Sequence, residues 1–360
     1  MGATPLKGLT GQRFFQPETQ ITISISKMAE VSKDNVTLVL VNAEDEGQRL
    51  DNYLLRICKG VPKSHVYRII RSGEVRLNGK RVAASDRVKD GDVLRIPPIR
   101  VAQKQEEIVA GAEIKADLPI LYEDEAILAI DKPAGIAVHG GSGVSFGVIE
   151  ALRRQRPQAR FLELAHRLDR ETSGLLLLGK KRSALSALHD MFREGSGQGR
   201  GVDKRYLLLV CGRWMDPLRN VRLPLCKYLL ESGERRVRVA SDAGDGKPSH
   251  TIFRLLARWE HFSLLEAELR TGRTHQIRVH CAHLGFPIAG DEKYGDFALN
   301  RMLPKEGLKR MFLHAWKMKL SHPLSGAEMA LQAPLPEALH RFLKILSSKE
   351  TLEYGQTQTF

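Results

Sequence analysis

The chain has 360 residues, of which 42% are hydrophobic, so it is long enough to bury two or three globular cores. Its 56 Lys and Arg outnumber its 42 Asp and Glu, which gives a net charge of +14. No run approaches the roughly 18–20 apolar residues of a membrane span, and the N-terminal part lacks the apolar core of a signal peptide. The 4 cysteines contain no CxxC pair, which is typical of reduced cytoplasmic thiols and disfavours a disulfide framework or a zinc site.

The first segment, residues 1–36, carries Gly, Pro, Thr and Gln without a sustained hydrophobic period, and we expect it to be disordered. Strand-like alternation begins around Val36. Met28 opens the stretch that leads into this alternation. Met28 is therefore a candidate for the native start, which would make the first 27 residues an upstream extension.

Positive charge is concentrated in one part of the chain. Between Gln48 and Lys104 there are 14 Lys and Arg and 5 Asp and Glu, so +9 of the net +14 lies there. Such a concentration favours a polyanionic partner, most often a nucleic acid. The alternative is a basic surface that only keeps the protein soluble.

The same part of the chain predicts two helices followed by a hairpin. The apolar residues of "QRLDNYLLRICK" recur at helical spacing, and "KSHVYRIIRSG" predicts a second helix with Ser64 as N-cap and Gly73 as its end. In "EVRLNGKRV", Asn78-Gly79 is typical of a tight hairpin turn. "KDGDVLRIP" then turns into a last strand.

Residues 37–97 resemble the S4 RNA-binding domain in the order of these elements, over the full length of that domain. The resemblance implies that the second helix and the hairpin bind structured RNA, mostly through phosphates and shape. The side chains expected to make these contacts are basic: Lys63, Arg68, Arg71, Lys80 and Arg81. The alternative is a small basic α+β module with solvated lysines.

Beyond this unit, residues 98–117 are bounded by proline and weakly periodic, and we expect a linker. Residues 118–346 alternate strand-like and helix-like segments, as a single large α+β domain does. Residues 347–360 are expected to be a C-terminal tail.

The stretch "HRLDRETSG" places Asp169 in a polar turn ahead of a buried strand over 175–178. A carboxylate can act as a nucleophile, a general base or a metal ligand. Metal catalysis needs several ligands at fixed spacing, and the turn supplies none. Glycosidase chemistry needs a second acid, for which Glu163 and Glu171 are candidates. A purely structural Asp that caps a turn or forms a salt bridge is the remaining alternative.

Three further segments carry polar side chains beside apolar strands. Residues 143–147 match the G-x-S-x-G pattern of serine hydrolases, but no apolar strand precedes them as that motif requires. Lys204-x-Tyr206 opens a strand, where the tyrosine packs in the core or stacks on a base. In "LRTGRTHQIRVHCAHLG", His275 and His280 lie too far apart around a helix to share a metal. Arg273 and Arg278 are better placed to meet a phosphate or a carboxylate.

Together the stretches "HRLDRETSG", "KRY", "GKPSHTIF" and "GRTHQIRVH" with "PIAGDEKYG" resemble the successive motifs of the RluA family of pseudouridine synthases. With the S4-like unit, the resemblance covers residues 37–346, and it is strongest to the branch that acts on the large ribosomal subunit. It implies a pseudouridine synthase fold, in which a mixed, largely antiparallel sheet is flanked by helices. The implied reaction is the isomerisation of specific uridines to pseudouridine in 23S ribosomal RNA.

The resemblance also implies roles for individual residues. Asp169 would be the catalytic aspartate, acting on a uridine that has flipped out of its stack. Arg273 would pair with Asp169, Tyr206 would stack on the target base, and Arg167 would fill the gap that the flipped nucleotide leaves. Since neither a redox step nor a group transfer occurs, we expect no cofactor and no metal.

We expect a cytoplasmic monomer without membrane contacts, whose partner is 23S ribosomal RNA or the precursor of the large subunit. Two alternatives stay open at this point. A non-catalytic RNA-binding or assembly factor would tolerate the loss of Asp169. An RNA N-glycosylase would release uracil and leave abasic sites.

Overall fold

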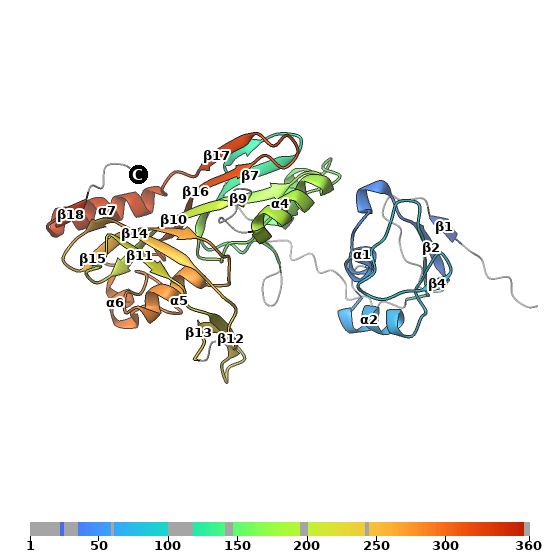
Figure 1. The fold of residues 1–360 in the computed structure, drawn as a ribbon, viewed down its shortest axis with the longest axis horizontal. Coiled ribbons are helices and arrows are strands. Elements are labelled where there is room, and N and C mark those ends of the chain that lie inside the picture. The colour runs from blue at the N-terminus through green and yellow to red at the C-terminus, as the bar shows by residue number, and fades with distance from the viewer. Residues whose placement is uncertain are drawn as a thin grey trace, which may run out of the picture. The chain divides into compact units, whose positions relative to one another are not determined.

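The computed structural model describes residues 22–24, 35–58, 61–99, 118–140, 147–194, 201–241 and 245–355. The chain divides into two units, residues 1–110 and residues 111–360 (Figure 1). Most of the expected linker over 98–117 lies outside the described residues. The same holds for residues 141–146, which include most of the G-x-S-x-G match.

The first unit combines a small sheet with two helices. Its elements are β1 (Thr22–Ser24), β2 (Thr37–Leu40), a 3₁₀ turn (Ala43–Asp45), α1 (Leu50–Ile57), α2 (Lys63–Arg71), β3 (Arg76–Leu77), β4 (Lys80–Arg81) and β5 (Val93–Ile96). The strand order is β1-β2-β5-β3-β4, and every pair except β1–β2 is antiparallel. Asn78 and Gly79 both have positive φ, as a two-residue hairpin turn requires. The predicted helix–helix–hairpin order is therefore confirmed.

Two local features of this unit differ from the expectations. The N-cap of α2 is Pro62 and not Ser64, because the helix begins two residues earlier than expected, at Lys63. The strand β1 falls inside the segment that was expected to be disordered, and it pairs in parallel with β2. The alternating β-branched residues of "ITISIS" explain this strand, since they favour extended backbone.

The second unit is built on a large, mostly antiparallel sheet. Its strands are β6 (Ile120–Glu123), β7 (Ile127–Lys132), β8 (Glu163–Leu164), β9 (Ser173–Gly179), β10 (Asp203–Cys211), β11 (Leu218–Val221), β14 (Thr251–Arg258), β15 (Phe262–Leu269), β16 (Leu313–Ser321), β17 (Glu328–Gln332) and β18 (Tyr354–Gly355). The central order is β11-β14-β15-β10-β16-β9-β7-β6, in which β16 and β9 are parallel. A separate hairpin joins β12 (Leu225–Leu229) to β13 (Arg235–Val239).

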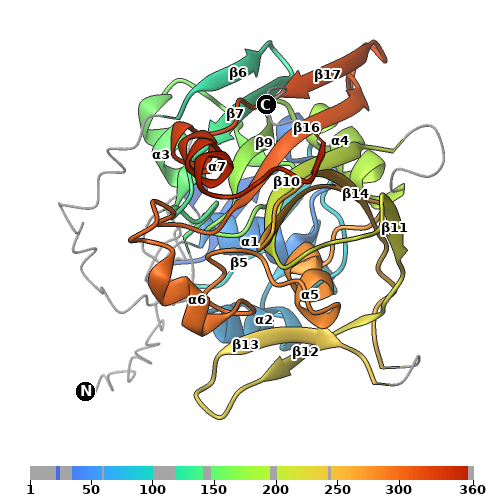
Figure 2. The same cartoon turned by 90° about the vertical axis from the view of Figure 1, so that its left-hand side faces the viewer.

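Helices cover both faces of this sheet. They are α3 (Val148–Gln155), α4 (Arg182–Glu194), α5 (Gln276–His283), α6 (Phe297–Met302) and α7 (Glu337–Lys349). Along β10 the side chains alternate between two cores: Leu208 packs in the core shared with α3, α4 and α5, and Leu209 packs in the core shared with α7. Figure 2 shows α5 between the sheet and the β12–β13 hairpin. The expected α+β architecture is confirmed.

The strand after the Asp169 turn is buried along its whole length, as its unbroken apolar run predicts. It begins where the chain passes very close to β16. At Gly174, which has a φ of 109°, an added Cβ would lie 2.2 Å from the carbonyl oxygen of Ala315. Only glycine fits this approach. The final residues of "HRLDRETSG" thus fix the end of the turn against β16.

The C-terminal boundary lies further along the chain than expected. The helix α7 continues to Lys349, and Tyr354–Gly355 pairs with β14 as β18. Residues 347–355 are therefore part of the second unit and not a tail. Residues 356–360 lie outside the described part of the chain.

Candidate active site

The turn that carries Asp169 is held by backbone hydrogen bonds. The N–H of Thr172 donates to the carbonyl of Asp169 at 3.1 Å, and the N–H of Gly135 donates to the carbonyl of Arg170 at 2.8 Å. Leu168 is buried beneath the turn. The Asp169 side chain keeps 20% exposure, so the fold presents this carboxylate at an accessible edge.

A buried lysine next to this turn reinforces it. The Nζ of Lys132 donates to the carbonyls of Pro133, Ile136 and Arg170, at 2.8, 2.9 and 3.1 Å. Burial lowers the pKa of Lys132 to about 7, because the charged form loses its hydration. The three carbonyls replace that hydration, and one of them belongs to the residue after Asp169.

The carboxylate of Asp169 faces a cation from α5. Nη1 of Arg278 lies 3.3 Å from Oδ2 of Asp169. The same guanidinium forms two 2.7 Å hydrogen bonds with the carboxylate of Asp291, a bidentate pair. The side chain of Arg278 is 5% exposed and that of Asp291 is 0% exposed. Arg278 therefore joins a partly exposed carboxylate to a buried one.

Asp291 is positioned by the chain around it. The N–H groups of Lys293 and Tyr294 donate to its carboxylate at 2.8 and 3.1 Å. Burial by itself would raise the pKa of Asp291, but the hydrogen bonds and the charge of Arg278 outweigh burial and lower this pKa. Asp291 is thus ionised at neutral pH and fixes the direction of the Arg278 guanidinium.

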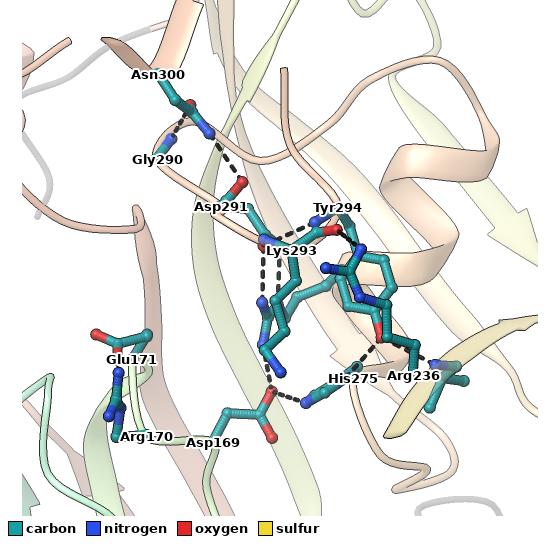
Figure 3. Close-up of polar contacts among 12 residues, drawn as sticks. Asp169, Arg170, Glu171, Arg236, His275, Gly290, Asp291, Lys293, Tyr294 and Asn300 are labelled. Carbon is teal, nitrogen blue, oxygen red and sulfur yellow. Dashed lines mark hydrogen bonds and ion pairs between the residues drawn. The ribbon is translucent and has the colours of Figure 1, made fainter. Parts of the chain in front are cut away.

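His275 approaches Asp169 from the start of α5, and the two side chains point toward each other in Figure 3. Nε2 of His275 lies 3.7 Å from Oδ2 of Asp169. Its Nδ1 lies 2.8 Å from the hydroxyl of Tyr294, which also accepts a hydrogen bond from the N–H of Val237. The hydroxyl proton therefore points at Nδ1, and in the neutral ring Nε2 carries the proton that faces Asp169. Burial lowers the pKa of His275, which favours this neutral form, although the charge of Asp169 opposes the shift.

A cavity of about 480 Å³ opens at this place, and all four residues predicted for substrate chemistry line it. Asp169 and Arg167 come from the turn, Tyr206 from β10, and Arg273 from the segment before α5. Arg167 and Arg273 are exposed, whereas Tyr206 is 8% exposed. The fold thus brings together residues that are more than 100 positions apart.

The predicted pairing of Arg273 with Asp169 is wrong. Nε of Arg273 donates instead to the backbone carbonyl of Pro248 at 3.1 Å, and Arg278 is the arginine that meets Asp169. The physical reason is the position of the two arginines relative to α5. Arg273 precedes α5, while Arg278 lies on the buried face of α5 that packs toward the turn. The sequence had marked both arginines as candidates to meet a carboxylate.

The contributions of Asp291, Tyr294 and His275 were not predicted from the sequence. Asp291 and Tyr294 belong to "GDEKYG", which was recognised as a motif without a role for its side chains. A buried aspartate 13 residues after an arginine shows no helical or strand periodicity, so spacing alone gave no signal of their contact.

The cavity wall is strongly basic. It carries one group of cations, namely Arg167, Arg193, Lys204, Arg270, Arg273 and Arg278, and two acids, Asp169 and Glu194. A wall of this composition attracts a polyanion. Among the described residues, no cluster of His, Cys, Asp or Glu has the arrangement of a metal site.

The basic side chains predicted for RNA contact in the first unit are exposed where they are described. Arg68 and Arg71 lie on α2, and Lys80 and Arg81 form β4. Nη2 of Arg81 donates to the carbonyl of Ser72 at 2.9 Å, which ties the hairpin to the end of α2. The side chain of Lys63 lies outside the described part of the structure.

Comparisons with known proteins agree with both units. The chain matches the family model of RNA pseudouridylate synthase over residues 126–283 and that of the S4 domain over residues 48–94. It is 50% identical over 321 residues to ribosomal large subunit pseudouridine synthase C of Salmonella typhi, which covers 88% of this chain and 98% of the relative. The protein of the same name from Escherichia coli K12 is 51% identical over 318 residues, with 87% of this chain and 97% of the relative covered.

A solved structure shows the same fold. Human RNA pseudouridylate synthase domain containing 1 has a TM-score of 0.53 and 24% sequence identity, covering 68% of this chain and 91% of the human chain. No helix among the described residues is long and apolar enough to cross a membrane. The chain belongs to the RluA family of RNA pseudouridylate synthases, carries an S4 domain, and is an isomerase.

Proposed function

We propose that this chain converts specific uridines of 23S ribosomal RNA to pseudouridine, with Asp169 as the catalytic carboxylate. The observation that carries the proposal is the position of Asp169 in a basic cavity, held between Arg278 and His275. The names of the relatives support the large-subunit substrate. In the cell the reaction takes place in the cytoplasm, and the enzyme acts as a monomer.

The reaction breaks the N1–C1′ bond, turns the uracil, and forms a C5–C1′ bond, with loss of the C5 proton and gain of a proton at N1. Three first steps are open to the carboxylate: attack at C1′, attack at C6, or removal of a sugar proton. In each of them the uridine has left its stack, at a cost of a few kcal/mol. The atoms of the product are those of the substrate, so the proposed reaction needs no external oxidant, reductant or group donor.

The direct test incubates the purified protein with 23S ribosomal RNA that lacks modifications. Pseudouridine formation at a few discrete uridines, without release of uracil, is the expected result. Free uracil with abasic sites would point to an N-glycosylase, and unchanged RNA that stays bound would point to an assembly factor. Mapping pseudouridine in ribosomal RNA from a deletion strain identifies the natural positions.

Tyr206 offers a test of base stacking. Tyr206→Phe keeps the ring, so affinity for RNA should change little. Tyr206→Ala should weaken productive binding by about 1–3 kcal/mol if the ring stacks on a base. Because Tyr206 is buried, the Ala variant should also lose roughly 3–5 kcal/mol of stability. The assay is therefore done well below its melting temperature, and equal affinity and turnover for Ala and wild type would remove Tyr206 from the substrate site.

The S4 domain offers a test of how RNA binding is divided between the two units of the chain. Replacing Arg68, Arg71 and Lys80 with Gln should weaken binding to a ribosomal RNA fragment. It should also reduce the slope of log affinity against log salt by about 2, since each phosphate contact adds roughly 0.7–0.9. The three side chains are exposed, so the melting temperature should stay unchanged.

The matched control for this variant removes three exposed lysines of the second unit. They are Lys309, Lys319 and Lys344. The control carries the same change in net charge as the S4 variant. Its slope of log affinity against log salt should stay closer to that of wild type. Equal slopes for the two triple variants would show that the S4 side chains act only as general surface charge.

A further inference from the structure

One wall of the cavity holds a mostly buried lysine whose ammonium group has no hydrogen-bond partner among the described residues. Lys204 lies on β10, lines the cavity and is 7% exposed. Within the described part of the chain, its Nζ forms no hydrogen bond or salt bridge. The contact it does make is with the ring of Phe192, whose centroid lies 5.7 Å from Nζ. A buried cation is costly unless an anion or a set of acceptors meets it, so this arrangement favours a ligand.

A neutral histidine lies on the same wall. Nε2 of His166 accepts a hydrogen bond from the N–H of Leu177 at 3.0 Å. Burial, together with the charge of Lys204, lowers the pKa of His166 to about 3, so the ring is neutral at pH 7. In that state the ring proton lies on Nδ1. The ring is also hydrogen-bonded to the backbone of Arg167, so His166 is held by the protein and Lys204 is left as the donor that faces the cavity.

Lys204 and His166 flank one aromatic ring. The rings of His166 and Phe192 lie 4.9 Å apart between centroids, and the ammonium of Lys204 lies near the same Phe192 ring. The backbone at Gly272 leaves space beside the ammonium, because a Cβ added there would lie 3.7 Å from Nζ. All four residues line the cavity.

The ammonium of Lys204 is separate from the network that holds Asp169. The carboxylate of Asp169 is met by Arg278 and His275, on the side of α5. Lys204 has no role in that network, since its electrostatic partner is Asp203 at the start of β10. Lys204 is therefore available to a ligand when Asp169 is engaged with Arg278.

We propose that Lys204 forms a subsite for one phosphate group of the RNA backbone next to the target uridine, on a wall shaped by His166 and Phe192. A phosphate accepts hydrogen bonds from the ammonium of Lys204, and its negative charge offsets the positive charge of this mostly buried side chain. A uracil carbonyl would accept the hydrogen bonds but would leave the charge unmatched. The inference rests on the proposed function, because it places an RNA strand in the cavity.

The test uses full-length Lys204→Met, Lys204→Arg and the control Lys344→Met, which removes one exposed lysine outside the cavity. The probes are a short RNA with the target uridine and copies that carry one neutral methylphosphonate linkage each. Lys204→Met should bind the unmodified RNA roughly tenfold more weakly, as expected for a lost charge-assisted hydrogen bond. Its salt slope should fall by about 0.7–0.9, the contribution of one phosphate. Lys204→Arg should keep most of the slope, and Lys344→Met should match wild type.

The neutral linkages identify the contact. One linkage near the target should weaken binding to wild type severalfold and should not weaken binding to Lys204→Met any further. Lys204→Met could instead bind the unmodified RNA more weakly and still lose as much affinity as wild type at every neutral linkage. That result would show that Lys204 contacts a base, and it would overturn the proposal. Unchanged affinity and slope for Lys204→Met would overturn it as well.

A melting curve separates this role from a structural one. Burial lowers the pKa of Lys204 to about 8, so at neutral pH the charge opposes folding, and Lys204→Met should melt at the same temperature as wild type or higher. A lower melting temperature with unchanged RNA binding would assign Lys204 to the core. Pseudouridine formation by wild type on the same RNA is measured in parallel. Its absence would refute the proposed function, while the linkage series would still decide the phosphate subsite.

Discussion

Asp169→Asn should abolish pseudouridine formation while RNA affinity stays within a few-fold of wild type. Asparagine keeps the volume of the side chain but is neither an anionic nucleophile nor a base. Arg278 keeps its bidentate pair with Asp291, so the cavity should retain its shape. The measurement is single-turnover formation of pseudouridine in a 23S ribosomal RNA fragment, together with binding of the same fragment.

The matched control is Glu171→Gln, which removes a carboxylate from the same turn. Glu171 pairs with Arg170 at 2.7 Å and does not line the cavity. Turnover by this variant should stay close to that of wild type. Normal turnover by Asp169→Asn would exclude Asp169 as the catalytic group, and it would leave the site without an assigned carboxylate.

The position of Asp169 could be predicted because local signals define it. The apolar run over 175–178 predicts a buried strand, and the polar stretch before it has to be a turn at the edge of the sheet. The hairpin at Asn78-Gly79 was predictable for the same reason, since its residue types match the backbone conformation of the turn. In each case the residues that decide the structure are neighbours in the sequence.

The partner of Asp169 could not be predicted in this way. Arg278 is 109 positions further along, and whether it or Arg273 reaches the carboxylate depends on where α5 begins. His275 sets that start with a left-handed backbone, at a φ of 55°. Tyr294 holds the His275 ring from another loop. These contacts follow from tertiary packing, which no periodicity in the sequence reports.

Removing Arg278 should strongly reduce the stability of the protein. In Arg278→Met the carboxylate of Asp291, which is fully buried, loses its cation, and breaking a buried pair costs roughly 3–5 kcal/mol. The same change removes the cation from Asp169, so turnover should be lost as well. Arg278→Lys keeps a positive charge but cannot form the bidentate pair with Asp291. Its stability should therefore lie between that of wild type and that of Arg278→Met. The control Arg273→Met removes an exposed arginine of the same cavity and should leave the melting temperature nearly unchanged.

The loss of stability in Arg278→Met should also depend on pH, and the pKa of Asp291 gives the sign. In the wild type this pKa is lowered, so the pair adds stability above the ordinary carboxyl pKa of about 3.9 and loses it as the pH falls through the lowered value. In the variant, burial without Arg278 raises the pKa of Asp291, so the charged carboxylate opposes folding at neutral pH and the protonated one does not. The difference in melting temperature between wild type and variant should therefore be largest at neutral pH and shrink toward pH 4. A difference that stays constant between pH 7 and pH 4 would show that Arg278 stabilises the fold through packing and not through its pair with Asp291.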